Sequence, residues 1–256
     1  MTGASSGIGL ELAKQFAEHG FDLLVVAEDE AIADAARGLQ GAGGDVQAVR
    51  ADLATEDGLA ELYRRVDADG RPLDAVALNA GIGAGGAFAT DTDLSDELKL
   101  IDLNVRSTVH VAKHVLREMV ARGEGRMLFT SSIASTMPGS FQAVYNASKS
   151  FVQSFGLALR EELKDSGVSI TLLMPGPTET EFFQRADMLD TKVGQADKDD
   201  PADVARDGFE ALMAGKERVE SASLSTKLQG RGSRFLPDKA KAKMHRRMAE
   251  PKPADR

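Results

Sequence analysis

The feature of this sequence that most constrains its fold is a regular alternation of short apolar runs with stretches of helical periodicity. The apolar runs contain few interleaved polar residues, which is typical of strands buried on both faces of a sheet. They cover residues 21–27, 46–49, 73–78, 127–129 and 168–174. Helical patterns cover residues 8–19, 29–40, 55–68, 95–122 and 145–165, and Asp200-Pro201 is typical of the start of another helix. This alternation predicts an α/β fold in which a doubly wound parallel sheet carries helices on both faces.

Composition narrows the class of protein further. A chain of 256 residues with 42% hydrophobic residues can build a complete core, and it shows no internal repeat. The absence of cysteine excludes disulfides and thiolate metal sites and is compatible with a reducing cytoplasm. No apolar run approaches the ~18 residues of a membrane span, and no signal peptide is visible. Since the net charge is −9, we expect no nucleic-acid partner. The lack of cysteine and of a visible signal peptide leads us to expect a cytoplasmic protein.

Charge is distributed unevenly along the chain. Residues 225–256 hold ten Lys or Arg and three Asp or Glu, so this segment carries +7 and the remainder −16. We therefore predict a folded domain over residues 1–224 and a basic C-terminal tail over residues 225–256. Leu236, Ala240, Met244 and Met248 recur every four residues in this tail. That spacing indicates a basic amphipathic helix, which could contact an acidic partner or an anionic membrane surface, or form a solvated tail or an oligomer arm.

A glycine-rich turn opens the sequence. Residues 2–9 read TGASSGIG, with Gly3, Gly7 and Gly9 just before and within the first helical pattern. Glycine allows a tight turn whose backbone can approach a pyrophosphate closely. The helix that follows directs free N–H groups and its positive dipole end at the phosphates. A glycine-rich turn can also simply begin an ordinary helix, so this motif alone leaves both interpretations open.

Tyr145 and Lys149 are the second chemical motif. They stand four residues apart and therefore share one face of a helix. A fixed positive charge favours the phenolate, so Lys149 is expected to lower the pKa of Tyr145 from ~10 toward neutral pH, where it can transfer protons. Such a pair also occurs on surface helices without any function.

Two further motifs lie between these. Asn79-Ala80-Gly81 follows the apolar run at 73–78, and Thr130-Ser131-Ser132 follows the run at 127–129, with Ser132 thirteen residues before Tyr145. The order and spacing of all four motifs resemble the short-chain dehydrogenase/reductase family, in its single-domain branch of about 250 residues, over residues 2–216. The resemblance implies a Rossmann-type fold and an NAD(P)-dependent oxidoreductase that interconverts a carbonyl and an alcohol. It also implies a homodimer or homotetramer.

The resemblance assigns the catalytic residues Asn104, Ser132, Tyr145 and Lys149. Ser132 stabilises the developing alkoxide, Tyr145 transfers the proton, and Lys149 binds the nicotinamide ribose and lowers the Tyr145 pKa. Asn104 distorts its helix and holds a water that links Lys149 to solvent, although by residue type alone it could be a poor helix former on a surface. No metal is expected, because His110 and His114 share a helix without further ligands.

The cofactor-binding residues belong to the glycine-rich turn and to the ends of the strands. Asp52 either hydrogen-bonds the adenine amine, as the resemblance implies, or caps a helix. Asn79 is expected to tie neighbouring strands together, and Gly81 to admit the ribose. The full predicted set is Gly3, Ser5, Ser6, Gly7, Ile8, Gly9, Glu28, Asp52, Leu53, Asn79, Ala80, Gly81, Tyr145, Lys149, Pro175, Gly176, Thr178 and Thr180.

Glu28 bears on the choice between NAD and NADP. It ends the second strand of the family pattern, where a carboxylate can accept from a ribose 2′-OH and would repel a 2′-phosphate, so NAD is favoured. Apolar residues stand at the positions where the family has its cleft and lid, so we expect an apolar alcohol or carbonyl compound as the substrate. The same residues could equally pack in the core. They are Met137, Phe141, Phe182, Phe183, Met188 and Leu189.

The sequence departs from the family pattern at its start. Family members have an apolar strand before the glycine-rich turn, and here only Met1 precedes Thr2. That first strand would be central, between the strands ending near Ala27 and Asn79, so its absence predicts unpaired backbone groups on two buried strands. Either the sequence lacks an upstream segment or the product is impaired.

Two functional hypotheses follow from these observations. The catalytic set favours an oxidoreductase, and the missing strand favours a non-catalytic dinucleotide-binding or interaction protein.

Overall fold

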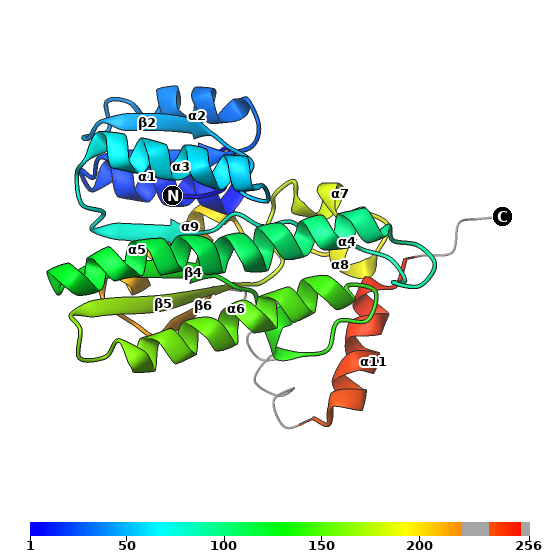
Figure 1. The fold of residues 1–256 in the computed structure, drawn as a ribbon. Coiled ribbons are helices and arrows are strands. Elements are labelled where there is room, and N and C mark those ends of the chain that lie inside the picture. The colour runs from blue at the N-terminus through cyan, green and yellow to red at the C-terminus, as the bar shows by residue number, and fades with distance from the viewer. Residues whose placement is uncertain (222–235, 252–256) are drawn as a thin grey trace.

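The computed structural model of the protein describes residues 1–221 and 236–251, in which parallel strands lie between two layers of helices (Figure 1). The strands are β1 (Leu23–Ala27), β2 (Val46–Arg50), β3 (Ala75–Leu78), β4 (Gly125–Thr130), β5 (Val168–Pro175) and β6 (Arg218–Ser221). β1 pairs with β2, and the others follow the order β3-β4-β5-β6, all parallel. The five predicted strands are confirmed. β6 was not predicted, because its sequence RVES is short, polar and only partly buried.

The helices divide between the two faces of the sheet. α1 (Gly7–Glu18), α2 (Ala31–Leu39) and α9 (Pro201–Met213) cover one face. α3 (Glu56–Asp69), α5 (Thr108–Arg122) and α6 (Ala143–Glu162) cover the other, with α4 (Leu94–Ile101) leading into α5. The predicted doubly wound α/β class is thus confirmed.

Local sequence explains where these helices begin and end. Thr55 caps α3 by accepting from the backbone N–H of Gly58 at 3.0 Å. Gly70 ends the same helix in a left-handed conformation, with φ of 69°. Asp200 caps α9 by accepting from Ala202 N–H at 2.8 Å, with Pro201 at the first helical position as predicted.

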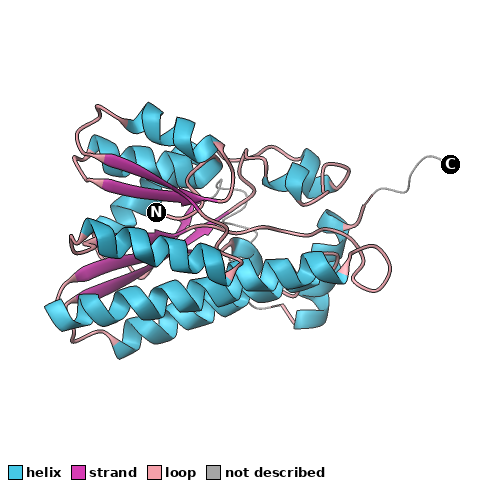
Figure 2. Cartoon of the chain, turned by 45° about the horizontal axis from the view of Figure 1, so that its top comes forward, coloured by secondary structure: helices cyan, strands magenta, loops and turns pink. Residues whose placement is uncertain are grey.

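Residues 1–3 join the two parts of the sheet. Met1 O accepts from Val26 N at 2.9 Å, Thr2 N donates to Ala77 O at 3.0 Å, and Gly3 N donates to Val26 O at 2.8 Å. Figure 2 shows the N-terminus between the two groups of strands. Residues 1–3 therefore lie between β1 and β3, the place where the first strand of the family was expected. Among the described residues, this short contact is the only backbone link between the two groups of strands.

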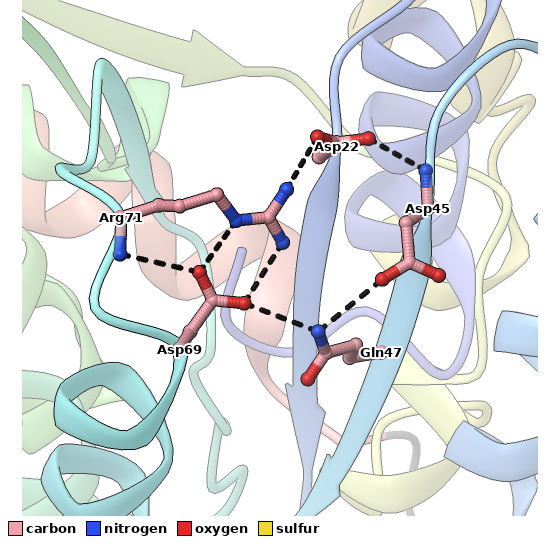
Figure 3. Close-up of polar contacts among 5 residues, drawn as sticks. All are labelled: Asp22, Asp45, Gln47, Asp69 and Arg71. Atoms are coloured by element: carbon pink, nitrogen blue, oxygen red, sulfur yellow. Dashed lines mark hydrogen bonds and ion pairs between the residues drawn. The ribbon is translucent and has the colours of Figure 1, made fainter.

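An ionic network ties the two parts of the sheet together at the opposite end of the strands (Figure 3). Arg71, in the loop between α3 and β3, binds Asp69 at 2.6 Å and Asp22, just before β1, at 2.5 Å. Asp22 also accepts from Asp45 N–H at 2.6 Å, and Gln47 on β2 donates to Asp69 at 3.1 Å. The hydrogen bonds from Arg71 lower the pKa of Asp69 to about 2. The network thus links the β1–β2 pair to the segment that enters β3.

The described part of the predicted basic tail packs onto the fold. Residues 238–249 form α11 (Asp238–Ala249), which contacts α8 (Lys192–Gln195). Ala249 is buried beside α7 (Phe182–Arg185) in a cluster with Phe183 and Met188. The predicted helix is therefore present, but it is a packed element rather than a solvated one. The proposed boundary at residues 224 and 225 lies outside the described residues. Among these, no helix is both long enough and apolar enough to span a membrane.

Candidate active site

One large cavity lies at the carboxyl ends of the strands. Its volume is about 1120 Å³, and its walls come from the glycine-rich turn, the strand ends, the start of α6, the segment 175–199 and α11. All the residues predicted to bind the cofactor line it, together with Ser132. Ligands of open α/β sheets bind at this edge, so the cavity is the natural place for the predicted chemistry.

The glycine-rich turn forms one wall and suits a pyrophosphate. Gly3 has φ of 65°, and a Cβ there would come within 2.8 Å of Ala80 Cα. Gly7 has φ of 55°, and its Cβ would come within 2.9 Å of the Thr180 side chain. Ser6 precedes α1 without a capping side-chain hydrogen bond, and the first turn holds no acidic residue. The first N–H groups of α1 and its positive dipole end are therefore free of a side-chain acceptor.

Carboxylates gather where the turn meets the end of β1. Glu28 lines the cavity and pairs with Lys99 of α4, with 3.3 Å between Nζ and Oε2. Asp29 accepts from Ser5 Oγ at 2.9 Å through Oδ2, and its buried Oδ1 has no partner among the described residues. Sequence reasoning missed Lys99, which is distant in sequence, and Asp29, which was assigned to the start of a helix. A second carboxylate directly after Glu28 was the signal that could have identified it.

Asp52 does not cap α3, whose N-cap is Thr55, but it stabilises the turn that leads into this helix. Its Oδ1 accepts from Ala54 N–H at 3.0 Å and its backbone oxygen from Thr55, which stabilises the turn before α3. It also lines the cavity.

Asn79 links the central elements, as predicted. Its N–H donates to Thr2 Oγ1 at 3.0 Å, and its side-chain amide donates to Gly3 O at 3.3 Å. Its Oδ1 accepts from Thr130 Oγ1 at 3.0 Å. The side chain therefore connects the glycine-rich turn, β3 and β4, and holds both walls of the cavity in register.

Ser132, Tyr145 and Lys149 come together at the other end of the cavity. Tyr145 and Lys149 lie on the first turns of α6 and are 9% and 6% exposed. Ser132 follows β4, and its Oγ accepts from Ala134 N–H at 3.1 Å. Lys149 donates to Thr130 O at 3.0 Å, and its Nζ lies 5.9 Å from the centroid of the Tyr145 ring.

The pKa of Tyr145 differs from the sequence prediction. Burial raises it to about 12, and a side-chain hydrogen bond with Ser132 opposes that rise. Burial also lowers the pKa of Lys149 to about 8. Desolvation disfavours the charged form of both groups, and here it outweighs the expected effect of the lysine on the phenol. The phenol is therefore protonated at neutral pH.

Asn104 lies behind this group in a distorted helix, as predicted. Residues Asp102–Ser107 form a π-helical segment between α4 and α5. The Asn104 side chain accepts from Ile82 N–H at 3.0 Å, and its amide donates to Ile82 O at 2.9 Å and to Ser148 Oγ at 3.1 Å. It is 1% exposed, so it is not a surface residue. The side chain fixes the backbone beside Gly81, and the Asn104 backbone oxygen accepts from Thr108 Oγ1 at 2.8 Å.

The apolar residues expected at the substrate end separate into three groups. Met137, Phe182 and Phe183 line the cavity. Phe141 and Met188 instead pack in the cluster around Ala249, because α11 covers them, and Leu189 is exposed. Sequence reasoning missed the contribution of α11, whose Met244, His245, Arg247 and Met248 complete this wall.

The two histidines of α5 pack against Tyr63. Its hydroxyl hydrogen-bonds His110 Nδ1 at 2.6 Å, and its ring stacks on His114 with centroids 4.1 Å apart. In the described residues, no three His, Asp or Glu side chains gather as a metal site would require.

Comparison with known proteins places this site in a family. The sequence pattern described as short chain dehydrogenase matches residues 1–189. The chain belongs to the short-chain dehydrogenase/reductase family. Sulfoacetaldehyde reductase 2 of Chromohalobacter salexigens is 34% identical over 190 residues, covering 71% of this chain and 73% of that protein.

Solved structures of the family have the same fold. A short-chain dehydrogenase from Sphingobium yanoikuyae in complex with NADPH matches with a TM-score of 0.79 and 27% identity, covering 100% of this chain and 97% of that one. A family member from Burkholderia phymatum in complex with NAD matches with a TM-score of 0.80 and 25% identity, covering 90% of each chain. The protein is accordingly an NAD(P)-dependent oxidoreductase, and the choice between the two cofactors rests on its own residues.

Proposed function

We propose that the protein interconverts a carbonyl and an alcohol on a small apolar substrate, with Tyr145 as the general acid and base. The observation that carries this proposal is the placement of Ser132, Tyr145 and Lys149 in one cavity with the glycine-rich turn. Protonated Tyr145 can donate to a carbonyl oxygen, and Ser132 can stabilise the alkoxide that develops there. Lys149 contributes a buried cation close to the same point.

The dinucleotide would lie along the cavity, with its phosphates at the start of α1. Residues 79–81 and 175–180 would flank its nicotinamide end. When bound, it supplies the hydride chemistry, which no side chain can provide. The protein residues hold the substrate oxygen, exclude water and move the proton.

We further propose a preference for NAD. Glu28 and Asp29 place two carboxylates where the adenosine ribose would lie, and Asp29 Oδ1 is a buried acceptor without a partner. A ribose hydroxyl satisfies such an acceptor, whereas a 2′-phosphate would be repelled. Lys99 partly neutralises Glu28, so the discrimination should be moderate.

A cytoplasmic location and a homodimeric or homotetrameric state remain predictions. Chemical crosslinking and light scattering of the purified protein test the second of these.

Turnover with a panel of ketones and alcohols, followed through the absorbance of NADH and NADPH, tests the proposed reaction. Consumption of the reduced cofactor with at least one ketone is expected, and mutation of Tyr145 should abolish it. The alternative, a non-catalytic dinucleotide-binding protein, predicts binding of NADH with no turnover of any ketone or alcohol in the panel.

A further inference from the structure

Helix α11 closes the substrate end of the cavity, and besides its packing on α7 and α8 it is bonded to the loop that precedes α6. It lies beyond residues 1–189, the part that matches the family pattern. Ser140 Oγ donates to Ala242 O at 3.1 Å, and His245 Nδ1 is 2.9 Å from Ser140 O. Arg246 stacks over the Phe141 ring at 5.5 Å. The wall that α11 contributes is thus fixed in position relative to the loop that precedes α6.

The contact with Ser140 O determines which ring nitrogen of His245 donates and which accepts a hydrogen bond. A carbonyl oxygen only accepts, so the contact with Ser140 O requires the proton on Nδ1. The ring is 5% exposed, and burial lowers its pKa, so the imidazole is neutral at pH 7. Nε2 is then an acceptor, and it has no hydrogen-bond partner among the described residues. Because His245 lines the cavity, a ligand there can supply that partner.

Gln142 adds a second unsatisfied polar group from the same loop. It is 7% exposed and lines the cavity. Its backbone is bonded to Gly139 and Asn146, but its side-chain amide has no partner within residues 1–221 and 236–251. It precedes Tyr145 by three residues and therefore lies about one helical turn, roughly 5 Å, from it along α6.

Much of the rest of this wall is apolar or ion-paired. Met137, Phe182, Phe183, Met244 and Met248 supply the apolar surface. Arg185 pairs with Glu181 at 2.5 Å, and Lys198 lies 3.6 Å from Glu179. Arg247 and Lys192 are exposed. His245 and Gln142 are neutral residues of this wall whose side-chain polar ends line the cavity without a protein partner among the described residues, and they match a neutral hydroxyl better than an anion.

We propose that the substrate is an apolar ketone, or the corresponding secondary alcohol, that carries a second hydroxyl remote from the reacting carbon. This hydroxyl donates to His245 Nε2 and accepts from the Gln142 amide, while the reacting oxygen lies at Tyr145. The inference rests on the proposed function, because it takes Tyr145 as the reacting end. The second hydroxyl is bound and not transformed.

A matched set of substrates tests this inference. We would compare a decalone bearing a hydroxyl on its second ring, the unsubstituted decalone and the corresponding decalone carboxylic acid. The wild-type kcat/KM for the hydroxy ketone should exceed that for the unsubstituted ketone by about tenfold or more. His245→Leu should bring this ratio close to one, and His245→Gln, which retains an acceptor, should restore part of it. Met244→Leu, on the same wall, should leave the ratio within about twofold.

A second measurement does not depend on turnover. The protein has four histidines, so the ring signals of His245 can be assigned by NMR with the His245→Leu variant. In protein saturated with NAD⁺, the hydroxy ketone should shift the Nε2 signal, and the unsubstituted ketone should shift it much less.

The possible outcomes distinguish failure of the hydroxyl site from failure of the proposed reaction. Equal kcat/KM for both ketones, or a ratio unchanged by His245→Leu, overturns the hydroxyl site while the reaction stands. Preference for the carboxylate would assign an anion site instead. If no ketone is reduced although NADH binds, the proposed function fails. The NMR arm then decides the hydroxyl site alone, and equal shifts with both ketones would contradict it.

Discussion

The Lys149 ammonium nitrogen lies 5.9 Å from the centroid of the Tyr145 ring, and both side chains are buried. In this arrangement the lysine does not lower the pKa of the phenol below its ordinary value, because burial raises it to about 12. The cation itself is the group that titrates near neutral pH, since burial lowers the pKa of Lys149 to about 8.

The pKa values of Tyr145 and Lys149 predict how ketone reduction depends on pH. As pH rises through about 8, Lys149 loses its charge while Tyr145 stays protonated, so kcat/KM for ketone reduction should fall above that pH. Lys149→Arg keeps the charge and should remove the fall, although with lower activity. A pH–rate profile of both proteins checks this. A profile that stays flat to pH 10 in the wild type would assign no role to the lysine charge.

The ion pair between Glu28 and Lys99 is expected to influence the preference for NADH over NADPH. Glu28→Arg should reverse the preference toward NADPH, because it replaces a repulsive charge with an attractive one. Lys99→Ala leaves Glu28 unneutralised and should weaken NADPH binding by about two- to fivefold, as expected for a half-exposed pair.

Titration of NADH and NADPH by nicotinamide fluorescence measures these effects. Lys14→Ala, which removes another exposed lysine, is the control. A wild-type protein that binds NADPH far more tightly than NADH would contradict the assignment of Glu28.

The Arg71 network makes a prediction about stability. Arg71→Met should lower Tm by roughly one to a few degrees, because it unlinks the β1–β2 pair from the loop before β3. The folded-state pKa of Asp69, about 2, lies below its ordinary value of 3.8, so its contribution is present above about pH 4 and is lost as pH falls through about 2. The Tm difference between wild type and variant should therefore shrink on acidification.

Arg64→Met serves as the matched control for Arg71. Arg64 pairs only with Glu61 on the same helix among the described residues, so its loss should change Tm little at any pH. Equal losses of Tm for both variants would show that the network has no special role.

The amide of Asn104 is expected to stabilise the backbone beside Lys149. Asn104→Leu leaves the N–H and C=O of Ile82 without their partner at a partly buried site, which should cost about 1–3 kcal/mol of unfolding free energy. Asn104→Ser should cost less, since the hydroxyl can satisfy one of the two groups. Urea denaturation of both variants measures this cost, and a Leu variant as stable as wild type would contradict the account.

Much of this architecture was predictable from the sequence. Strands such as residues 168–174 contain few polar residues and are buried almost throughout, so their composition identifies them. Residues of the glycine-rich turn, Asn79 and the Ser132–Tyr145–Lys149 group also converge as predicted, since the carboxyl ends of parallel strands meet at one edge.

The remaining features depend on tertiary contacts that local patterns do not encode. Lys99 meets Glu28 across 71 residues of sequence, and His245 meets Ser140 across 105. The raised pKa of Tyr145 follows from burial by Phe182 and its neighbours, which a helical wheel cannot show. The position of α11 was missed for the same reason, because its basic composition is typical of a solvated tail.

The central claim is that Tyr145 transfers the proton at the reacting oxygen. The most direct test compares wild type and Tyr145→Phe in ketone turnover and in NADH titration on the same preparations. Because the change removes only the hydroxyl, kcat should fall at least about a thousandfold while the Kd for NADH changes less than about threefold. A variant that binds NADH normally and keeps more than about a tenth of the wild-type kcat would contradict the account.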